Sequence, residues 1–329
     1  MKAWVKAGVR SGELIIQADT PHPAMKQGHI EIAVKATSIN PVDNKLLHKP
    51  SPSENSGSII PHCDVAGVVT RLGDSVIDFN VGDRVFGCAG GIGALAGALC
   101  EFMVADAKLV APMPISLGFA EAAALPLVSI TAWEGLAEKA RTASDENILI
   151  LGATGGVGHL AVQLAKSRGA RVFAAVSSSQ KASIAARLGA DETILYNEET
   201  VDQYKMRLGL KDGFDVVFDT AGGSSVAAAI DAARNYGKLV LVNDPSGLEL
   251  QSAYRKSLSI HFIMMLLPML TGVGRERHGL ILREIADLVD KGHIRPLLAK
   301  RRFSFAQANE AHAYFESGKA CGKIVLENV

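Results

Sequence analysis

The sequence lacks an excess of charge of either sign. Its 34 basic and 34 acidic residues are spread along 329 positions and give a formal net charge of zero. A surface that binds nucleic acid or an anionic membrane would require a cluster of basic residues. We therefore expect neither partner, and we expect the ligands to be small molecules.

Long apolar runs and paired cysteines are also missing. The longest apolar run, residues 258–270, is too short to span a bilayer and contains His261 and Pro268. The first residues have no apolar core of the signal-peptide type. The four cysteines are scattered without a C-x-x-C pair, which is typical of reduced thiols in the cytosol. Together these absences predict a cytoplasmic protein.

The clearest pattern lies in the middle of a chain that is long enough for two domains. Residues 148–151 form a short apolar run of the kind expected for a buried parallel strand. Residues 153–158 follow as a G-x-G-x-x-G pattern with alanine in place of the first glycine. A helical segment and a second apolar run, residues 172–176, complete a βαβ unit. In this context the glycine loop predicts a dinucleotide site, because glycine allows close approach to a pyrophosphate at a helix N-terminus.

The end of the second strand lacks the acidic residue that an NAD site usually has. Asp or Glu at that place binds the ribose 2′-hydroxyl, but this chain has Ser177-Ser178-Ser179-Gln180-Lys181. No carboxylate repels a 2′-phosphate here, while hydroxyls and an ammonium can bind one. A serine N-cap followed by a solvated lysine is a compatible second interpretation. We favour NADPH over NADH.

The segments around this unit differ in character. The first hundred residues are β-rich, with clean alternation over residues 29–36. After the βαβ unit, strands such as residues 214–219 and 237–242 alternate with helices, which indicates an open parallel sheet. Ligands bind beyond the carboxyl ends of such strands, which nominates Thr220, Ala221, Val242 and Asn243. The tail does not continue the alternation, so we expect it to return to the first domain.

The order of these parts resembles the medium-chain dehydrogenase/reductase superfamily, specifically its zinc-independent NADPH:quinone oxidoreductase branch. The matching motifs extend almost from end to end and are specific through their order and spacing. They are residues 40–43, 64–69, 81–85, 121–127, 131–133, 153–158, 213–220 and 322–326.

The resemblance implies an α/β fold with two domains and a homodimer. Residues 1–124 would form a GroES-like, β-rich catalytic domain, to which residues 266–329 return. Residues 125–265 would form an inserted Rossmann domain, a doubly wound parallel sheet that binds NADPH. The homodimer would form through a sheet edge near residues 239–242 and 259–264.

The resemblance also bears on metal binding. Zinc-dependent relatives hold a catalytic ion with Cys, His and Cys, and those positions correspond to Asn40, Cys63 and Leu127. Leucine cannot ligate, and residues 80–110 lack the four cysteines of a structural zinc site. Residues 62–64, with His48 upstream, are the one cluster that suggests a metal, but a partly buried thiol and an ordinary turn histidine explain it better. We expect no metal.

The expected chemistry follows from this lack of a Lewis acid. Alcohol oxidation becomes harder because nothing lowers the pKa of the hydroxyl, whereas reduction of a conjugated carbonyl spreads the negative charge by delocalisation. The resemblance implies hydride transfer from NADPH to a quinone or to the C=C bond of an α,β-unsaturated carbonyl. The alternatives are a zinc-dependent alcohol dehydrogenase of the same fold and a non-catalytic NADPH-binding redox sensor.

Individual roles are carried over from the resemblance. Asn40 would donate a hydrogen bond to the substrate carbonyl, Asp43 would brace the turn rather than act as a base, and Lys45 is a weak candidate proton donor. Solvent is the default proton source, because the first 195 residues contain no tyrosine. The substrate would be lined by Asn40, Cys63, Phe262 and Met264.

The remaining assignments concern the cofactor. The pyrophosphate would lie on residues 153–157, the 2′-phosphate on Ser177, Ser178 and Lys181, and the nicotinamide near Thr131 and Asn243. Tyr196 would border the adenosine, and Lys323 would reach the cofactor. The full set is Thr131, Ala153, Thr154, Gly155, Gly156, Val157, Ser177, Ser178, Lys181, Tyr196, Thr220, Ala221, Val242, Asn243 and Lys323.

Overall fold

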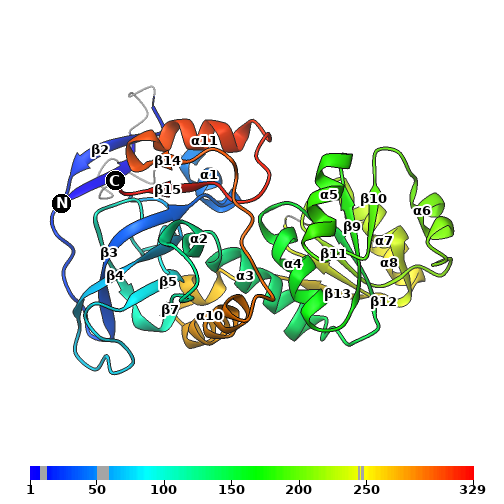
Figure 1. The fold of residues 1–329 in the computed structure, drawn as a ribbon, viewed down its shortest axis with the longest axis horizontal. Helices are drawn as coiled ribbons and strands as arrows, with labels where there is room; N and C mark the ends of the chain where they lie inside the picture. Colours follow the sequence, from blue (N-terminus) through cyan, green and yellow to red (C-terminus); the bar gives the residue numbers. More distant parts are fainter. Residues whose placement is uncertain (8–12, 50–58, 244, 246–247) are drawn as a thin grey trace. The chain divides into compact units, whose positions relative to one another are not determined.

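The computed structural model of the chain describes residues 1–7, 13–49, 59–243, 245 and 248–329. They form two units. Unit 1 comprises residues 1–127, 266–292 and 296–329, and unit 2 comprises residues 128–265 and 293–295. Unit 1 is therefore built from both ends of the chain (Figure 1). Among the described residues, no helix is long and apolar enough to cross a bilayer.

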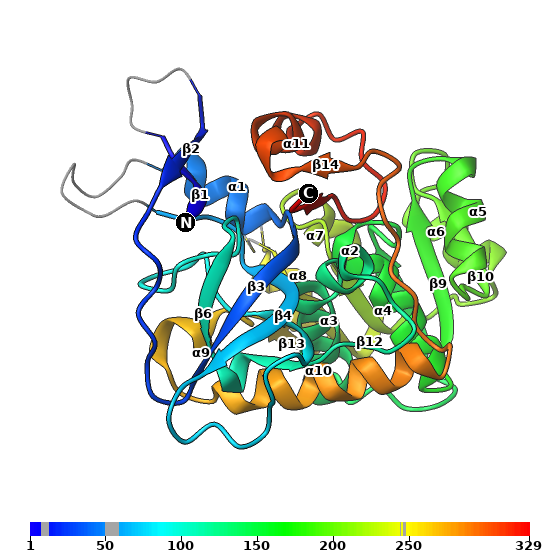
Figure 2. The same ribbon diagram turned by 60° about the vertical axis from the view of Figure 1, so that its left-hand side comes forward.

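A seven-stranded sheet is the framework of unit 1. Its two long strands, β3 (His29–Ser38) and β4 (Asp64–Leu72), are antiparallel and lie side by side (Figure 2). Alternate side chains of β3, Ile30, Ile32 and Val34, are buried, as the alternation over residues 29–36 predicts. The order is β14-β15-β3-β4-β5-β7, with β6 paired to β3.

The other elements of unit 1 are shorter. β1 (Lys2–Lys6) and β2 (Ile15–Asp19) form a separate antiparallel pair. The remaining strands are β5 (Arg84–Cys88), β6 (Phe102–Asp106), β7 (Val110–Pro112), β14 (Phe303–Ser304) and β15 (Val325–Glu327). The helices are α1 (Pro41–His48), η1 (Ala107–Leu109), α2 (Phe119–Ala123), α9 (Leu267–Thr271), α10 (Arg275–Asp290), η3 (Phe305–Gln307) and α11 (Ala308–Glu316).

Unit 2 is an open parallel sheet with the strand order β10-β9-β8-β11-β12-β13. The chain starts in the centre at β8 (Asn147–Leu151), fills one side through β9 (Arg171–Val176) and β10 (Glu192–Leu195), and then crosses to the other. This reversal next to β8 is the switch point at which doubly wound sheets bind their ligands. The predicted Rossmann architecture is confirmed.

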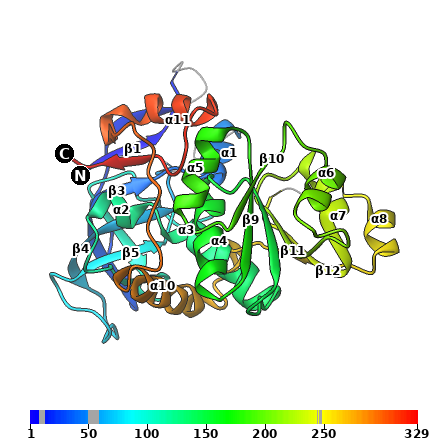
Figure 3. The same ribbon diagram turned by 45° about the vertical axis from the view of Figure 1, so that its right-hand side comes forward.

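Helices connect these strands. α4 (Gly156–Ser167) and α5 (Ser179–Arg187) both run beside β9 (Figure 3). α3 (Pro126–Trp133) leads into the unit. The other elements are η2 (Glu134–Lys139), α6 (Val201–Arg207), β11 (Phe214–Asp219), α7 (Ser225–Ala232), β12 (Ala233–Leu241), α8 (Leu250–Arg255) and β13 (Ser259–Phe262).

The expected sheet edge near residues 239–242 and 259–264 lies in the second of these stretches. β12, which contains residues 239–241, pairs with β11 on one side and with β13 on the other. The edge strand on this side is β13, whose four residues are SIHF. The expected homodimer through this edge stays a prediction.

Phe214 lies in the core of unit 2, and we predict that its removal destabilises this unit. Phe214 is fully buried and packs edge-to-face on Phe173 with ring centroids 5.1 Å apart. Phe214→Ala should lower the free energy of unfolding by about 3–5 kcal/mol, because it removes transfer energy and leaves a cavity. Urea unfolding followed by Trp133 fluorescence in a Trp4→Phe background would measure this change in unit 2. The control Leu250→Ala, on a side chain that is 65% exposed, should change it by about 0.5 kcal/mol or less; equal effects would contradict the packing account.

Candidate active site

Asp64, the first residue of β4, is the centre of a buried polar network in unit 1. Its side chain has no exposed surface, so each carboxylate oxygen requires partners. Oδ2 accepts hydrogen bonds from Ser38 Oγ (2.7 Å) and Asn40 Nδ2 (2.8 Å). Oδ1 accepts from the backbone N–H of Leu127 (2.8 Å). The network thereby joins the end of β3, the start of β4 and the start of α3.

Lys323 supplies the positive charge of this network. Its ammonium is 3.4 Å from Asp64 Oδ2 and donates to Asn40 Oδ1 (2.5 Å) and to the carbonyl of Ile39 (2.9 Å). The side chain is only 3% exposed. β15 pairs with β3, with Val325 opposite Ser38, and this pairing brings Lys323 to Asn40. The ammonium of Lys323 is thus held by partners inside unit 1, and the expected contact of Lys323 with the cofactor stays a prediction.

Asp43 braces the same region from α1. Its carboxylate accepts from the backbone N–H groups of Asn40 (2.7 Å) and Cys63 (3.1 Å), which ties the start of the helix to the residue before β4. Burial, and then the charge of Asp64, raise the pKa of Asp43 to about 6. Bracing is the role that the sequence analysis preferred. Lys45, the weak candidate proton donor, is exposed on α1.

Two residues expected to line the substrate are buried within unit 1. Asn40 is fully buried, and its amide is hydrogen-bonded to Asp64 and Lys323. Cys63 is also fully buried. Its hydrogen bond with Cys88, then burial and the charge of Asp43, raise the pKa of its thiol well above the ordinary value. The contact of either residue with a substrate stays a prediction.

The residues at the metal-ligand positions do not fit a catalytic zinc ion. Asn40 is hydrogen-bonded to an ammonium, and Leu127 has no side-chain ligand and contributes only its backbone N–H, so Cys63 alone could ligate strongly. Zinc requires deprotonated sulfur, imidazole or carboxylate ligands. Within the part of the chain that the structure describes, no three or more His, Cys, Asp or Glu side chains are grouped to hold a metal ion.

Sequence reasoning missed a buried histidine pair. His62 Nε2 and His312 Nε2 are 2.9 Å apart, and neither side chain has exposed surface. Asn44 Nδ2 donates to Glu316 (2.9 Å), so Asn44 Oδ1 is an acceptor, and His312 Nδ1 donates to it (3.0 Å). These contacts fix the direction of the hydrogen bonds in this group. His312 Nε2 is therefore the acceptor, and His62 Nε2–H donates to it. His62 has a φ of +75°, which is rare for a residue other than glycine.

The dinucleotide residues come together in unit 2. The loop between β8 and α4 packs so closely that a Cβ on Gly158 would lie 2.1 Å from the carbonyl oxygen of Gly152. Ala153 and Thr154 are buried in the turn, while Gly155, Gly156 and Val157 have exposed surface at the first turn of α4. A close backbone turn that leads into a twelve-residue helix fits a pyrophosphate.

The 2′-phosphate candidates lie together at the end of β9. Ser178 caps α5 by accepting from the N–H of Lys181 (3.4 Å), and Lys181 Nζ donates to Ser177 Oγ (3.0 Å). The serine cap is therefore present, and the ammonium of Lys181 lies beside the Ser177 hydroxyl, while binding of a 2′-phosphate there stays a prediction. Asn197 Nδ2 also donates to the carbonyl of Ser177 (3.3 Å), a contact that the sequence did not predict.

The other predicted cofactor residues are also placed. Asn243 Nδ2 donates to the carbonyl of Thr220 (2.6 Å), so the ends of β11 and β12 are joined beside Ala221 and Val242. Thr131 is nearly buried in α3, and Tyr196, just after β10, is 52% exposed. Phe262 and Met264 are exposed in unit 2, whereas Asn40 and Cys63 belong to unit 1, so a shared substrate pocket stays a prediction.

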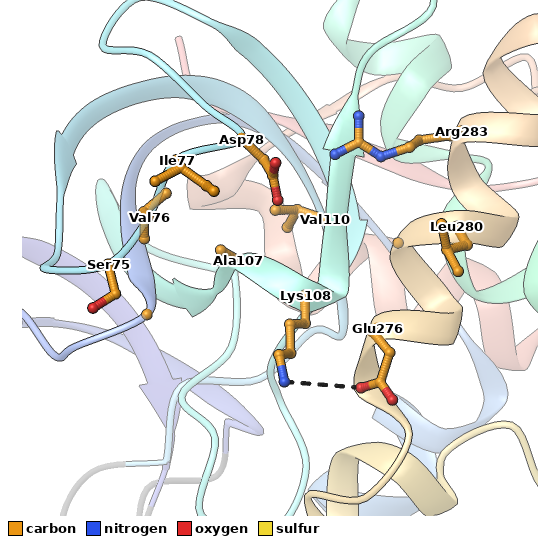
Figure 4. Close-up of a pocket in the computed structure, with 12 residues that line it drawn as sticks. Ser75, Val76, Ile77, Asp78, Ala107, Lys108, Val110, Glu276, Leu280 and Arg283 are labelled. Atoms are coloured by element: carbon orange, nitrogen blue, oxygen red, sulfur yellow. Dashed lines mark ion pairs between the residues drawn. The ribbon is translucent and has the colours of Figure 1, made fainter.

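Unit 1 also contains a groove of about 290 Å³ (Figure 4). Lys108 and Glu276 pair across it at 4.0 Å, and Asp78 and Arg283 add one charge of each sign. None of its lining residues belongs to the Asp64 network. Because its charges balance, the groove indicates no ligand class, and we assign it none.

Comparisons with known proteins agree on one fold. Residues 26–115 match the model of the alcohol dehydrogenase GroES-like domain, and residues 188–326 match that of the zinc-binding dehydrogenases. The chain is similar to the 2-methylene-furan-3-one reductase of Solanum lycopersicum (34% identity, over 100% of this chain and 79% of that protein). It is also similar to the chloroplastic NADPH-dependent alkenal/one oxidoreductase of Arabidopsis thaliana (30% identity, 99% and 79%). A solved structure of an alcohol dehydrogenase superfamily protein from Novosphingobium aromaticivorans matches with a TM-score of 0.93 (31% identity, 100% of both chains).

The histidine pair predicts a loss of stability in acid. Burial lowers the pKa of His312 from its ordinary 6.5 to about 4, and burial, followed by His312 and Lys323, lowers the pKa of His62 well below 6.5. The pair's contribution is therefore complete above pH 6.5 and is lost as the pH falls toward 4. His312→Asn should reduce this loss by about 3 kcal/mol, as measured by urea unfolding at several pH values.

A matched control for this experiment is His29→Asn, at a histidine that is only partly buried. It should leave the pH dependence of the unfolding free energy unchanged. A His312→Asn protein with the same acid sensitivity as the parent would show that the buried pair does not control it.

Proposed function

Because this chain belongs to the medium-chain dehydrogenase/reductase superfamily, in its quinone oxidoreductase branch, we propose that it is an NADPH-dependent reductase that acts without metal. Its acceptor is a quinone or the C=C bond of an α,β-unsaturated ketone or aldehyde. That the chain is an oxidoreductase is supported by relatives that are named reductases and oxidoreductases. The observation that supports the proposal is the side-chain network at Asn40. This residue corresponds to a zinc ligand of zinc-dependent relatives, and its amide is hydrogen-bonded to Lys323 and Asp64 instead.

In this proposal the chain's residues bind the cofactor at three places. The N-terminus of α4 and the backbone of residues 153–157 hold the pyrophosphate through N–H groups and the helix dipole. Ser177, Ser178 and Lys181 hold the 2′-phosphate, with no carboxylate between them to oppose it. NADPH, when bound, supplies the hydride. Thr131 and Asn243 are proposed to border the nicotinamide.

In this proposal unit 1 contributes a rigid turn before α1, and no metal ion acts as a Lewis acid. Asp64 and Lys323 hold the turn before α1 in one conformation, and Asp43 fixes the same turn to the start of β4. A metal-free site suits an acceptor that delocalises the charge brought by hydride, because no ion is needed at the oxygen. The proton then comes from solvent.

The direct test is NADPH oxidation at 340 nm with a small panel of acceptors. The panel contains 1,4-benzoquinone, 9,10-phenanthrenequinone, an alkenal and an alkenone. We expect turnover of a quinone or enone that is unchanged by EDTA. Loss of turnover with EDTA would favour the zinc-dependent alternative, and tight NADPH binding with no turnover of any acceptor would favour the redox sensor.

Lys181 gives a separate prediction about cofactor preference. Lys181→Met should lower the ratio of kcat/KM for NADPH to that for NADH roughly 10- to 100-fold, because a charge-assisted hydrogen bond to the 2′-phosphate is lost. The activity with NADH should change little. The control Lys211→Met removes an exposed lysine of the same unit and should not alter the ratio. An unchanged ratio in Lys181→Met would remove this residue from the cofactor site.

A further inference from the structure

Three residues of the C-terminal segment pack with unit 2, although the segments on both sides of them belong to unit 1. These residues, 293–295, are held by the side chain of Gln163 on α4. Gln163 Oε1 accepts from the backbone N–H of Arg295 (3.0 Å), and its Nε2 donates to the Arg295 carbonyl (2.9 Å). The Arg295 guanidinium also donates to the carbonyl of Arg187 at the end of α5. A two-way backbone contact of this kind fixes the register of the segment.

Gln163 is bound equally well to its own helix. It is 4% exposed, and its Nε2 also donates to the carbonyl of His159 (2.9 Å). His159 Nδ1 in turn donates to the carbonyl of Gly155 in the glycine loop (3.0 Å). The same side chain therefore connects the first turns of α4 to Arg295. A buried amide with both ends paired is costly to replace.

The residues that follow Arg295 hold the backbone of Lys323. The N–H of Lys323 donates to the carbonyl of Leu297 (2.8 Å), and the carbonyl of Lys323 accepts from the N–H of Ala299 (2.8 Å). The approach is so close that a Cβ on Gly322, which has a φ of +82°, would lie 2.2 Å from the Leu297 oxygen. Lys323 is thus fixed on both sides of its Cα, while its ammonium binds Asn40 and Asp64.

We propose that residues 293–299 form a strap through which Gln163 sets the position of Lys323, which makes Gln163 a positioning residue for the candidate active site. The contacts run without a break from the glycine loop through His159 and Gln163 to Arg295, and from there along four residues of chain to Lys323. The link to the cofactor rests on the proposed function, because it assumes that the dinucleotide binds at α4.

The first test needs no turnover. Gln163→Met keeps the length of the side chain but removes its three hydrogen bonds. In protein without dinucleotide, hydrogen exchange of the Ala299 and Lys323 amides should become roughly 2- to 30-fold faster, the range expected for such coupling. The control Gln251→Met changes an exposed glutamine of α8 and should leave both amides unchanged. Unchanged exchange in Gln163→Met would overturn the proposal.

The second test asks whether Gln163 acts through Lys323. In a double-mutant cycle with Lys323→Met, the effect of Gln163→Met on kcat/KM should largely disappear, because its target is gone. Effects that multiply independently would overturn the proposal. If Gln163→Met does not fold, Gln163→Glu keeps an acceptor for the Arg295 N–H and serves in both tests. Absence of turnover in the parent protein would refute the proposed function, while the exchange experiment would still decide the strap.

Discussion

The carboxylate of Asp64 and the ammonium of Lys323 are buried together, and the arrangement of unit 1 depends on them. Each would be strongly unfavourable alone in an interior of low polarity. The pair requires the C-terminal segment to return to the first part of the chain, because Lys323 lies 259 positions from Asp64. It also requires the start of α3, since the Leu127 N–H completes the partners of Asp64. Three distant segments are therefore held at one carboxylate.

This pair is also the basis of the proposed chemistry. The position of Asn40 corresponds to a metal ligand in zinc-dependent relatives, yet its oxygen accepts from an ammonium and its nitrogen donates to a carboxylate. A cation is already present there as part of the chain. We therefore propose hydride acceptors that need no ion on the oxygen, namely quinones and conjugated carbonyls rather than simple ketones or aldehydes.

Local patterns were sufficient to predict much of the fold. The glycine loop, the βα alternation and the alternation in β3 depend on neighbouring residues, and the structure confirms each of these elements. The serine cap and the lysine at α5 are local in the same way. The failures involve residues far apart in sequence. The partners of Asp64 and the contact between His62 and His312 are set by strand pairing and by the return of α11, and no short segment carries that information.

The strap, residues 293–299, is another feature that local sequence patterns did not predict. Residues 293–299 have no periodic pattern, so the sequence marked them only as part of the returning tail. These residues matter because Gln163 is hydrogen-bonded to the backbone of Arg295 and because Gly322 packs closely on the carbonyl of Leu297. Of these two, only Gly322 lay in a motif recognised from the sequence, and that motif indicated a strand rather than a contact.

The most direct measurement for this account compares the unfolding free energies of Lys323→Met and of the double variant Asp64→Asn/Lys323→Met, together with their turnover. The account predicts that the single variant loses about 3–5 kcal/mol, because Asp64 is left buried without its counter-charge. The double variant should regain most of that stability but not the turnover. A single variant as stable as the parent protein would contradict the central role given to this charge pair.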